Sequence, residues 1–246
     1  MPRYFLEVSY NGSQYSGFQS QENANTIQAE IEKAFKILQR EEVAMTGSSR
    51  TDAGVHALQN FFHFDFQQPL NPKFVYKINA ILPPQIVVRS VSQVSPGAHC
   101  RFDAISREYK YFIYRQKDPF LMGRAYYFPY KLDFDKLREA ASVVQEYHDF
   151  TSFSKRNTQV KTFQCQVSQS EWFWENGCLI YHVEANRFLR GMVRALTATM
   201  LQVGRGKIDL PEFRRIIEAR DCTKASFAVP AHGLFLVAVK FPLIEA

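Results

Sequence analysis

The sequence predicts an α+β protein made of two related halves, in which helices pack on antiparallel sheets. Short segments that alternate apolar and polar residues, as half-buried strands do, are interspersed with segments whose apolar residues recur at helical spacing. The order of these segments in the first part returns loosely in the second. With 46% hydrophobic residues in a chain of 246, there is enough apolar surface for helices to cover sheets.

The first half is predicted to run strand, helix, strand, strand, helix, strand. The first strand ends at Asn11-Gly12, a pair that favours turns. Thr26 is expected to cap the first helix, because its hydroxyl can accept a hydrogen bond from the first turn. Pro83-Pro84 ends the second helix. The expected strands are 3–10, 43–47, 58–66 and 86–94, and the expected helices are 26–40 and 72–82.

The second half repeats this mixture of elements. Glu175-Asn176-Gly177 is typical of a tight hairpin turn, so the segments on either side are expected to pair as antiparallel strands. The expected strands are 106–115, 161–174, 178–184 and 234–241, and the expected helices are 133–147, 187–203 and 211–219. We place the boundary near residue 104, which gives halves of 1–103 and 104–246.

Composition narrows the class of partner. The net charge of +6 favours a polyanionic partner, and the aromatic content of 15% leaves rings that could stack on bases. No apolar run approaches the roughly 18 residues that span a membrane, and the first residues lack the pattern of a signal peptide. We therefore expect a cytoplasmic protein. The four cysteines never form C-x-x-C, so no metal site is expected.

The segment most informative about function is 47–57, GSSRTDAGVHA, which concentrates polar residues between two predicted strands. Gly54 permits backbone angles that a β-carbon penalises, so the turn can present Asp52 outward near Arg50. A carboxylate beside a guanidinium is held ionised, and an ionised Asp can act as a nucleophile. The alternative is that Asp52 only caps the turn and pairs with Arg50.

A second feature is a run of arginines in the predicted helix 187–203. At 100° per residue, Arg187, Arg190 and Arg194 fall on one stripe, apart from the apolar face. Guanidinium groups in a line suit a series of phosphates. The alternative is an ordinary solvated surface.

Several segments together resemble the tRNA pseudouridine synthase A family. Residues 50–57, RTDAGVHA, are similar to the family signature. The similarity continues in order along nearly the whole chain. The other matching segments are 15–21 (YSGFQSQ), 26–28 (TIQ), 79–83 (NAILP), 102–114 (FDAISREYKYFIY), 148–153 (HDFTSF), 186–207 (NRFLRGMVRALTATMLQVGRGK) and 230–239 (PAHGLFLVAV). One departure is Ser49, where the family usually has Gly.

The resemblance implies a fold, a reaction and catalytic residues. The fold would be a pseudouridine synthase fold of two ferredoxin-like halves, and the reaction would isomerise uridine to pseudouridine without metal or cofactor. Asp52 would be the nucleophile, by attack on C1′, attack on C6 or a glycal route. Arg50 would pair with Asp52 and help displace the nucleotide, because a stacked base must be flipped to react. Tyr109, or alternatively Tyr111, would contact the uracil, and Arg194 would assist Asp52.

The resemblance also implies the partner. The substrate would be tRNA, modified at uridines 38, 39 and 40 of the anticodon stem-loop, and the enzyme would be a homodimer. Besides Asp52 and the residues around it, a further set is expected to contact RNA. This set is Tyr111, Arg107, Lys110, Arg187, Arg190 and His56, although His56 fits a structural role better than that of a general base.

Two other functions compete with this interpretation. A non-catalytic RNA-binding protein on the same fold would explain the basic charge and the aromatic residues, but it would not need the R-T-D turn. A different enzyme with an aspartate nucleophile, such as a phosphatase or a glycosidase, would need an acidic metal site or a second carboxylate. The nearest acids, Asp65 and Glu42, lie in other predicted elements.

Overall fold

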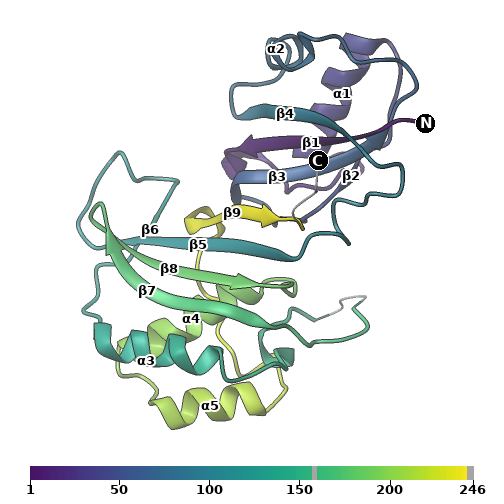
Figure 1. Ribbon diagram of the computed structural model, residues 1–246. Helices are drawn as coiled ribbons and strands as arrows, with labels where there is room; N and C mark the ends of the chain where they lie inside the picture. The colour runs from purple at the N-terminus through teal and green to yellow at the C-terminus, as the bar shows by residue number, and fades with distance from the viewer. Residues whose placement is uncertain (157–159, 243–246) are drawn as a thin grey trace. The chain divides into compact units, whose positions relative to one another are not determined.

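The computed structural model describes residues 1–156 and 160–242 (Figure 1). The chain forms two compact units. Unit 1 contains Met1–Ile105 and the chain from Phe235 onward, and unit 2 is Ser106–Leu234. Each unit has its own helices and strands, and we describe each by itself.

Unit 1 is a sheet with two helices. The sheet order is β4-β1-β3-β9, and β2 lies beside β3. All of these pairs are antiparallel except β3 with β9, which is parallel. The elements are β1 (Arg3–Tyr10), α1 (Ile27–Gln39), β2 (Thr46–Gly47), β3 (His56–Asp65), α2 (Phe74–Asn79), β4 (Ile86–Val94) and β9 (Leu234–Lys240), with a 3-10 turn at η1 (Gly12–Gln14).

The core of unit 1 lies between this sheet and its helices. Thr26 caps α1 as expected, since its hydroxyl accepts from Ala29 N at 3.3 Å. The buried face of α1 carries Phe35, whose ring lies edge-on to Phe64 and Phe66 at centroid distances of 5.2 Å. The aromatic side of β3 is therefore fixed against α1, which holds the chain that precedes β3 in place.

Unit 2 has a group of sheet strands with helices on one face (Figure 1). Its strands run β5-β8-β7, all antiparallel, with a short parallel β6 beside β5. Within the helical layers, α3 packs on β7 and α4, and α5 packs on α3 and α4. The elements are β5 (Ser106–Tyr114), β6 (Tyr126–Tyr127), α3 (Phe134–Val144), η2 (Thr151–Phe153), β7 (Val167–Glu175), β8 (Cys178–Ala185), α4 (Met192–Gly204), α5 (Leu210–Glu218) and η3 (Ala231–Gly233).

The mixed α+β class and the element order of the first half are confirmed. The strands expected at 3–10 and 86–94 match β1 and β4 to the residue, and the hairpin turn is present, with positive φ at Asn176 and Gly177. The closing strand, assigned above to the second half, pairs with β3 in unit 1. The ferredoxin-like character of the halves stays an expectation. In the described residues, no helix combines the length and apolar content needed to cross a bilayer.

Candidate active site

The segment that carries Asp52 is a turn between β2 and β3. Val55 N donates to Asp52 O at 3.2 Å, which closes a tight turn with Gly54 at φ +79°. A side chain at position 54 would be strained at this angle, so the glycine is required by the turn. Arg50 is exposed and Asp52 half-buried, while Thr51 between them is buried. The turn therefore places an exposed Arg50 and a half-buried Asp52 on either side of a buried residue.

The chain that follows β1 packs directly on this turn. Phe18 N donates to Thr51 O at 3.2 Å, and a β-carbon on Gly17 would lie 3.2 Å from the same oxygen. Gly17 also has φ +115°, a conformation that few side chains tolerate. Residues 15–21 and 50–57, two segments that carry the family resemblance, thus meet within unit 1.

His56 lies inside unit 1. Its ring is 1% exposed and stacks on Phe235 at 4.5 Å, and its Nδ1 accepts from Gly12 N at 3.2 Å. An imidazole nitrogen that accepts a hydrogen bond carries no proton, so this contact favours the neutral ring. His56 was among the residues expected to contact RNA. Its burial prevents a direct contact in this structure and supports the structural role that was its alternative.

Ser49 occupies the position where the resemblance usually has Gly. Its side chain is buried, and its hydroxyl has no hydrogen-bond partner in the part of the chain that the structure describes. A glycine at position 49 would therefore lose no bond from this hydroxyl. The buried Ser49 oxygen lowers the stability of the fold, because burial removes its hydrogen bonds to water and no hydrogen bond in the described residues replaces them.

The two tyrosines proposed as alternatives lie on β5 in unit 2, on one face of the strand as expected. Tyr111 is fully buried, and its hydroxyl donates to Pro230 O at 2.7 Å. Burial raises the pKa of Tyr111 far above its usual value. Tyr109 is 9% exposed and meets the ring of Phe188 edge-on at 5.1 Å. Tyr111 is thus a core residue, and Tyr109 is the more accessible of the pair.

The arginine stripe needs a correction. The predicted helix began at residue 187, but α4 begins at Met192, after Gly191 adopts a left-handed conformation that a right-handed helix excludes. Arg187 and Arg190 therefore precede the helix, and the helical spacing does not apply to them. Arg190 is exposed in a turn, and Arg187 is half-buried in the segment before it.

Arg194 does lie on α4, where its side chain is fixed. Its Nε and Nη2 both donate to Val229 O, at 3.1 and 2.8 Å. The next carbonyl along, that of Pro230, accepts from Tyr111. Arg194 and Tyr111 thus meet at the segment before η3, inside unit 2.

The remaining predicted RNA contacts lie on β5. Arg107 Nη1 donates to Asn186 O at 3.0 Å, which places it beside the segment that carries Arg187. Lys110 alternates to the other face of the strand, where its Nζ lies 5.5 Å from the centre of the Phe173 ring. The β5 cations are therefore divided between the two faces of the sheet.

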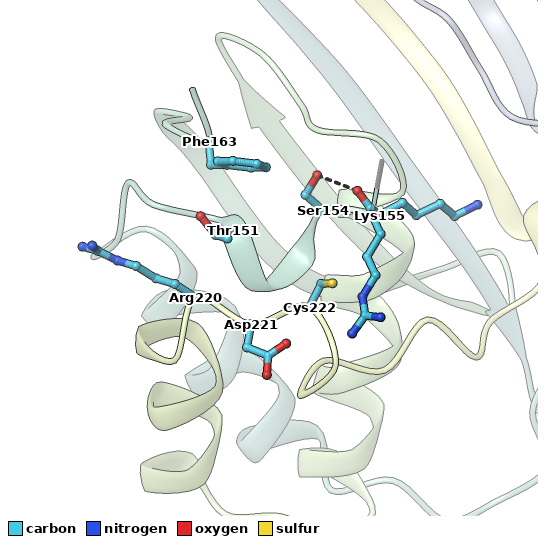
Figure 2. A pocket seen from close by; sticks show the side chains of 8 residues that line it. Thr151, Ser154, Lys155, Phe163, Arg220, Asp221 and Cys222 are labelled. Atoms are coloured by element: carbon cyan, nitrogen blue, oxygen red, sulfur yellow. Dashed lines mark hydrogen bonds between the residues drawn. The ribbon is translucent and has the colours of Figure 1, made fainter. Parts of the chain in front are cut away.

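Unit 2 also has a shallow cavity of about 320 Å³ (Figure 2). Arg220 at its rim pairs with Asp149 at 3.2 Å, so part of its positive charge is neutralised. None of the predicted site residues lines it. The lining residues are Thr151, Ser154, Lys155, Arg156, Phe163, Arg220, Asp221 and Cys222.

Sequence reasoning missed the side chains beneath the Asp52 turn. Asn60 and Tyr10 are buried and bond to this turn from β3 and β1. The signal was available, because Asn60 interrupts a row of inward-facing aromatic residues at every second position, Phe62 and Phe64. A polar residue in an apolar row is buried with a partner or not at all.

Comparison with known proteins identifies the family. The family model described as tRNA pseudouridine synthase matches residues 7–103 and 147–242. A protein of Parabacteroides distasonis is 46% identical over 98% of this chain and 97% of its own length. Proteins of Porphyromonas gingivalis and Bacteroides thetaiotaomicron are 42% and 44% identical, over 98% and 91% of their lengths and 98% of this chain. All three are named tRNA pseudouridine synthase A. The chain belongs to the tRNA pseudouridine synthase family and is an enzyme of the isomerase class.

Proposed function

We propose that the protein converts uridine to pseudouridine in tRNA, with Asp52 as the nucleophile. The observation that carries this proposal is the Asp52 turn, in which buried neighbours fix the backbone on both sides of a half-buried Asp52, two residues from the exposed Arg50. A binding protein needs no such carboxylate, since negative charge opposes contact with phosphate. Membership of the family supports the same reaction.

The proposed reaction balances within one nucleotide. The bond from ribose C1′ to uracil N1 breaks, the base turns, a bond forms from C1′ to C5, and the C5 proton moves to N1. Asp52 bonds transiently to C1′ or to C6, or removes a proton in a glycal route, and is regenerated. Arg50 is proposed to fill the space that the flipped base leaves.

Residues of unit 2 are proposed to serve the same substrate. Tyr109 is proposed to contact the uracil, and this is supported by its greater accessibility relative to Tyr111. Arg194 is proposed as a second cationic group, supported by the two hydrogen bonds that fix its guanidinium. Arg107, Lys110, Arg187 and Arg190 are proposed phosphate contacts. The proposal also keeps the two halves expected from the sequence. Residues 1–103 carry the Asp52 turn, and residues 104–246 carry the tyrosine strand and the arginine-rich segment.

The proposed substrate is the anticodon stem-loop of tRNA, with modification at uridines 38, 39 and 40. The proposed enzyme is a cytoplasmic homodimer. The net charge of +6 supports a polyanionic substrate, and raising the salt several-fold should weaken tRNA binding. Sedimentation at working concentration tests the dimer.

The decisive experiment compares the wild type with Asp52→Asn on unmodified tRNA, with pseudouridine mapped at single-nucleotide resolution. Asp135→Asn, on the exposed side of α3, is the matched control. We expect product at positions 38 to 40 with the wild type and the control, and none with Asp52→Asn, which should bind tRNA as before. Product formation by Asp52→Asn at the wild-type rate would overturn the nucleophile. Binding without product by the wild type would establish the non-catalytic alternative.

A further inference from the structure

A set of three hydrogen-bonded side chains lies beneath the Asp52 turn in unit 1. Asn60 is 0% exposed, Tyr10 4% and Thr51 8%. Asn60 Nδ2 donates to Ser49 O at 2.8 Å and to Tyr10 Oη at 3.2 Å, and Tyr10 Oη lies 2.8 Å from Thr51 Oγ1. The set therefore holds the chain on both sides of Arg50, at Ser49 and at Thr51. Thr51 directly precedes Asp52.

The donors and acceptors in this set have a consistent direction. Asn60 Nδ2 has two hydrogens, and both contacts use it as donor, while its Oδ1 accepts from Phe61 N at 2.9 Å. Tyr10 Oη accepts from Asn60, so its own hydrogen is available to Thr51 Oγ1. Each group in the set is neutral. None of these hydrogen bonds depends on a group that gains or loses a proton between pH 5 and 9.

A break in strand register aims Tyr10 at the turn. Val8 pairs with Asn60, but Tyr10 pairs with Ala57, so β1 and β3 shift by one residue between these pairs. A shift of this kind bends the strand locally and redirects the side chain that follows it. Ser9 Oγ stabilises the irregularity by donating to Leu58 O at 2.8 Å.

We propose that Tyr10 and Asn60 are positioning residues for the reaction of Asp52. They hold the Ser49 carbonyl and the Thr51 hydroxyl as two fixed points from which the Arg50 and Asp52 side chains project. This inference rests on the proposed function. A reacting group that is displaced by about 1 Å loses roughly a hundredfold in rate, so two buried bonds at the base of a turn can govern the chemical step.

A purely structural role would require less of these residues. A phenylalanine at position 10 would keep the contact that the Tyr10 ring makes with Phe18, at a centroid distance of 5.9 Å. Leucine at position 60 would extend the apolar row of β3. The sequence instead buries an amide and two hydroxyls, and their hydrogen bonds reach the turn at the Ser49 carbonyl and the Thr51 hydroxyl.

The test removes one hydroxyl at a time and separates rate from binding. The variants are Tyr10→Phe, Thr51→Val and the conservative Thr51→Ser, each assayed for kcat of pseudouridine formation and for tRNA binding. Tyr181→Phe is the matched control, because it removes the hydroxyl of another buried tyrosine, bonded to Ser170 Oγ at 3.0 Å in unit 2. Urea unfolding of every variant shows that the protein assayed is folded.

We expect Tyr10→Phe and Thr51→Val each to lower kcat about tenfold, with tRNA affinity unchanged. Each variant loses the hydrogen bond between residues 10 and 51 that holds the turn, but it keeps the exposed side chains that would contact RNA. Thr51→Ser should retain kcat within about twofold. The double variant should be no slower than the slower single variant, since both lose the same bond. Tyr181→Phe should lose stability but keep kcat.

Two results would overturn the inference. One is an unchanged kcat in folded Tyr10→Phe, and the other is a loss of kcat in Tyr181→Phe equal to that in Tyr10→Phe. Neither is confused with failure of the proposed function, which would appear as an active Asp52→Asn enzyme or an inactive wild type. An active wild type, an inactive Asp52→Asn and an unaffected Tyr10→Phe would reject the positioning role alone.

Discussion

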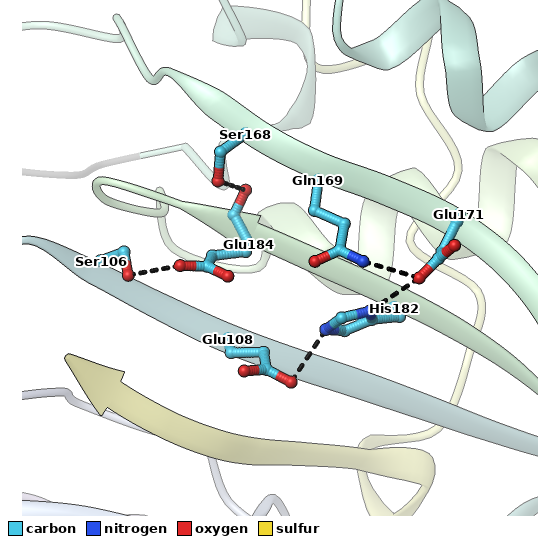
Figure 3. A network of polar contacts seen from close by, with 7 residues as sticks. All are labelled: Ser106, Glu108, Ser168, Gln169, Glu171, His182 and Glu184. Carbon is cyan, nitrogen blue, oxygen red and sulfur yellow. Dashed lines mark hydrogen bonds and ion pairs between the residues drawn. The ribbon is translucent and has the colours of Figure 1, made fainter.

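Each unit of the molecule has one prominent cluster of polar side chains, and the two clusters differ in charge and burial. In unit 1 the Tyr10–Asn60–Thr51 set is neutral and buried. In unit 2 His182 stands between two carboxylates, 2.9 Å from Glu108 and 3.2 Å from Glu171, on the sheet (Figure 3). Glu171 is half-exposed. A neutral buried set keeps its strength as pH and salt vary, whereas a set that contains carboxylates, one of them half-exposed at Glu171, is weakened by screening.

This difference matches what each location requires. The turn that carries Asp52 must hold a single geometry, and bonds between neutral groups of low exposure resist displacement by water. The His182 cluster joins three strands of a sheet that the backbone already holds together, as the register of β5, β8 and β7 shows. We therefore expect substitutions beneath the turn to cost more than substitutions in the His182 cluster.

The largest effect is expected from Gly12→Ala. A β-carbon on Gly12 would lie 2.0 Å from Val55 O, a backbone atom at the end of the Asp52 turn. Either the turn or the chain after β1 must move, and we expect a loss of about 3 kcal/mol in the free energy of unfolding, together with most of the activity. Gly97→Ala is the control, since a β-carbon there meets nothing within 4 Å. Equal urea midpoints for the two variants would show that the chain after β1 does not constrain the turn.

The second effect is expected from Asn60→Leu. The change keeps the number and branching of the side-chain heavy atoms but leaves the buried Ser49 O and Tyr10 Oη without the Asn60 donor. We expect a loss of about 2 kcal/mol in the free energy of unfolding, measured by urea denaturation. The loss should be the same at pH 6 and pH 8, because no charged group is involved. A variant as stable as the wild type would mean that the Asn60 amide contributes nothing net.

Much of the fold could be predicted because half-buried strands and capped helices produce local patterns in the sequence. The strand β1 alternates between half-buried and buried residues from Arg3 to Val8, and Thr26 marks the start of α1. The start of α4 was missed because apolar spacing continues through residues 187–191, and the backbone angle of Gly191 leaves no trace in that spacing. The two-residue strand β6 is too short to produce a pattern.

The site was predictable only in part, for a related reason. Composition pointed to the Asp52 turn, since a dense polar segment between two strands is visible in the sequence alone. Asn60 left a signal, as a polar residue beside a row of aromatic ones, but its bonding partners were not visible, because Tyr10 lies 41 residues from Thr51 and 50 from Asn60 along the chain. Contacts of this range depend on strand register, and the register here includes a shift that no single sequence displays.

The third effect is a dependence of stability on pH, and it concerns His63 in unit 1. Burial, followed by the positive charges of His99 and Arg3, lowers the pKa of His63 to about 4, against the opposing carboxylates of Asp65 and Asp103. The unfolded chain, with a histidine pKa near 6.5, then binds more protons than the folded one, so stability is full above pH 6.5 and falls as pH falls toward 4. Between pH 7 and pH 5 we expect His63 to account for a loss of about 1.5 kcal/mol.

The measurement is urea unfolding of the wild type and of His63→Gln at both pH values. The variant lacks the group that titrates in this window, so it should lose less stability than the wild type between pH 7 and pH 5. Carboxylates such as Asp65, whose pKa its hydrogen bond with Arg3 lowers, titrate below this window and do not interfere. Parallel curves for the two proteins would show that His63 is not the responsible group.

The smallest effect is expected from His182→Gln in unit 2. The glutamine retains polar atoms that can reach Glu108 and Glu171, and partly exposed ion pairs contribute little once side-chain entropy and screening are counted. We expect the free energy of unfolding to change by less than about 1 kcal/mol at pH 7, with kcat unchanged. Raising the salt should reduce the part of this difference that comes from charge. If His182→Gln proved as costly as Asn60→Leu, burial and neutrality would not be what distinguishes the two clusters, and the role assigned to the set beneath Asp52 would lose its physical basis.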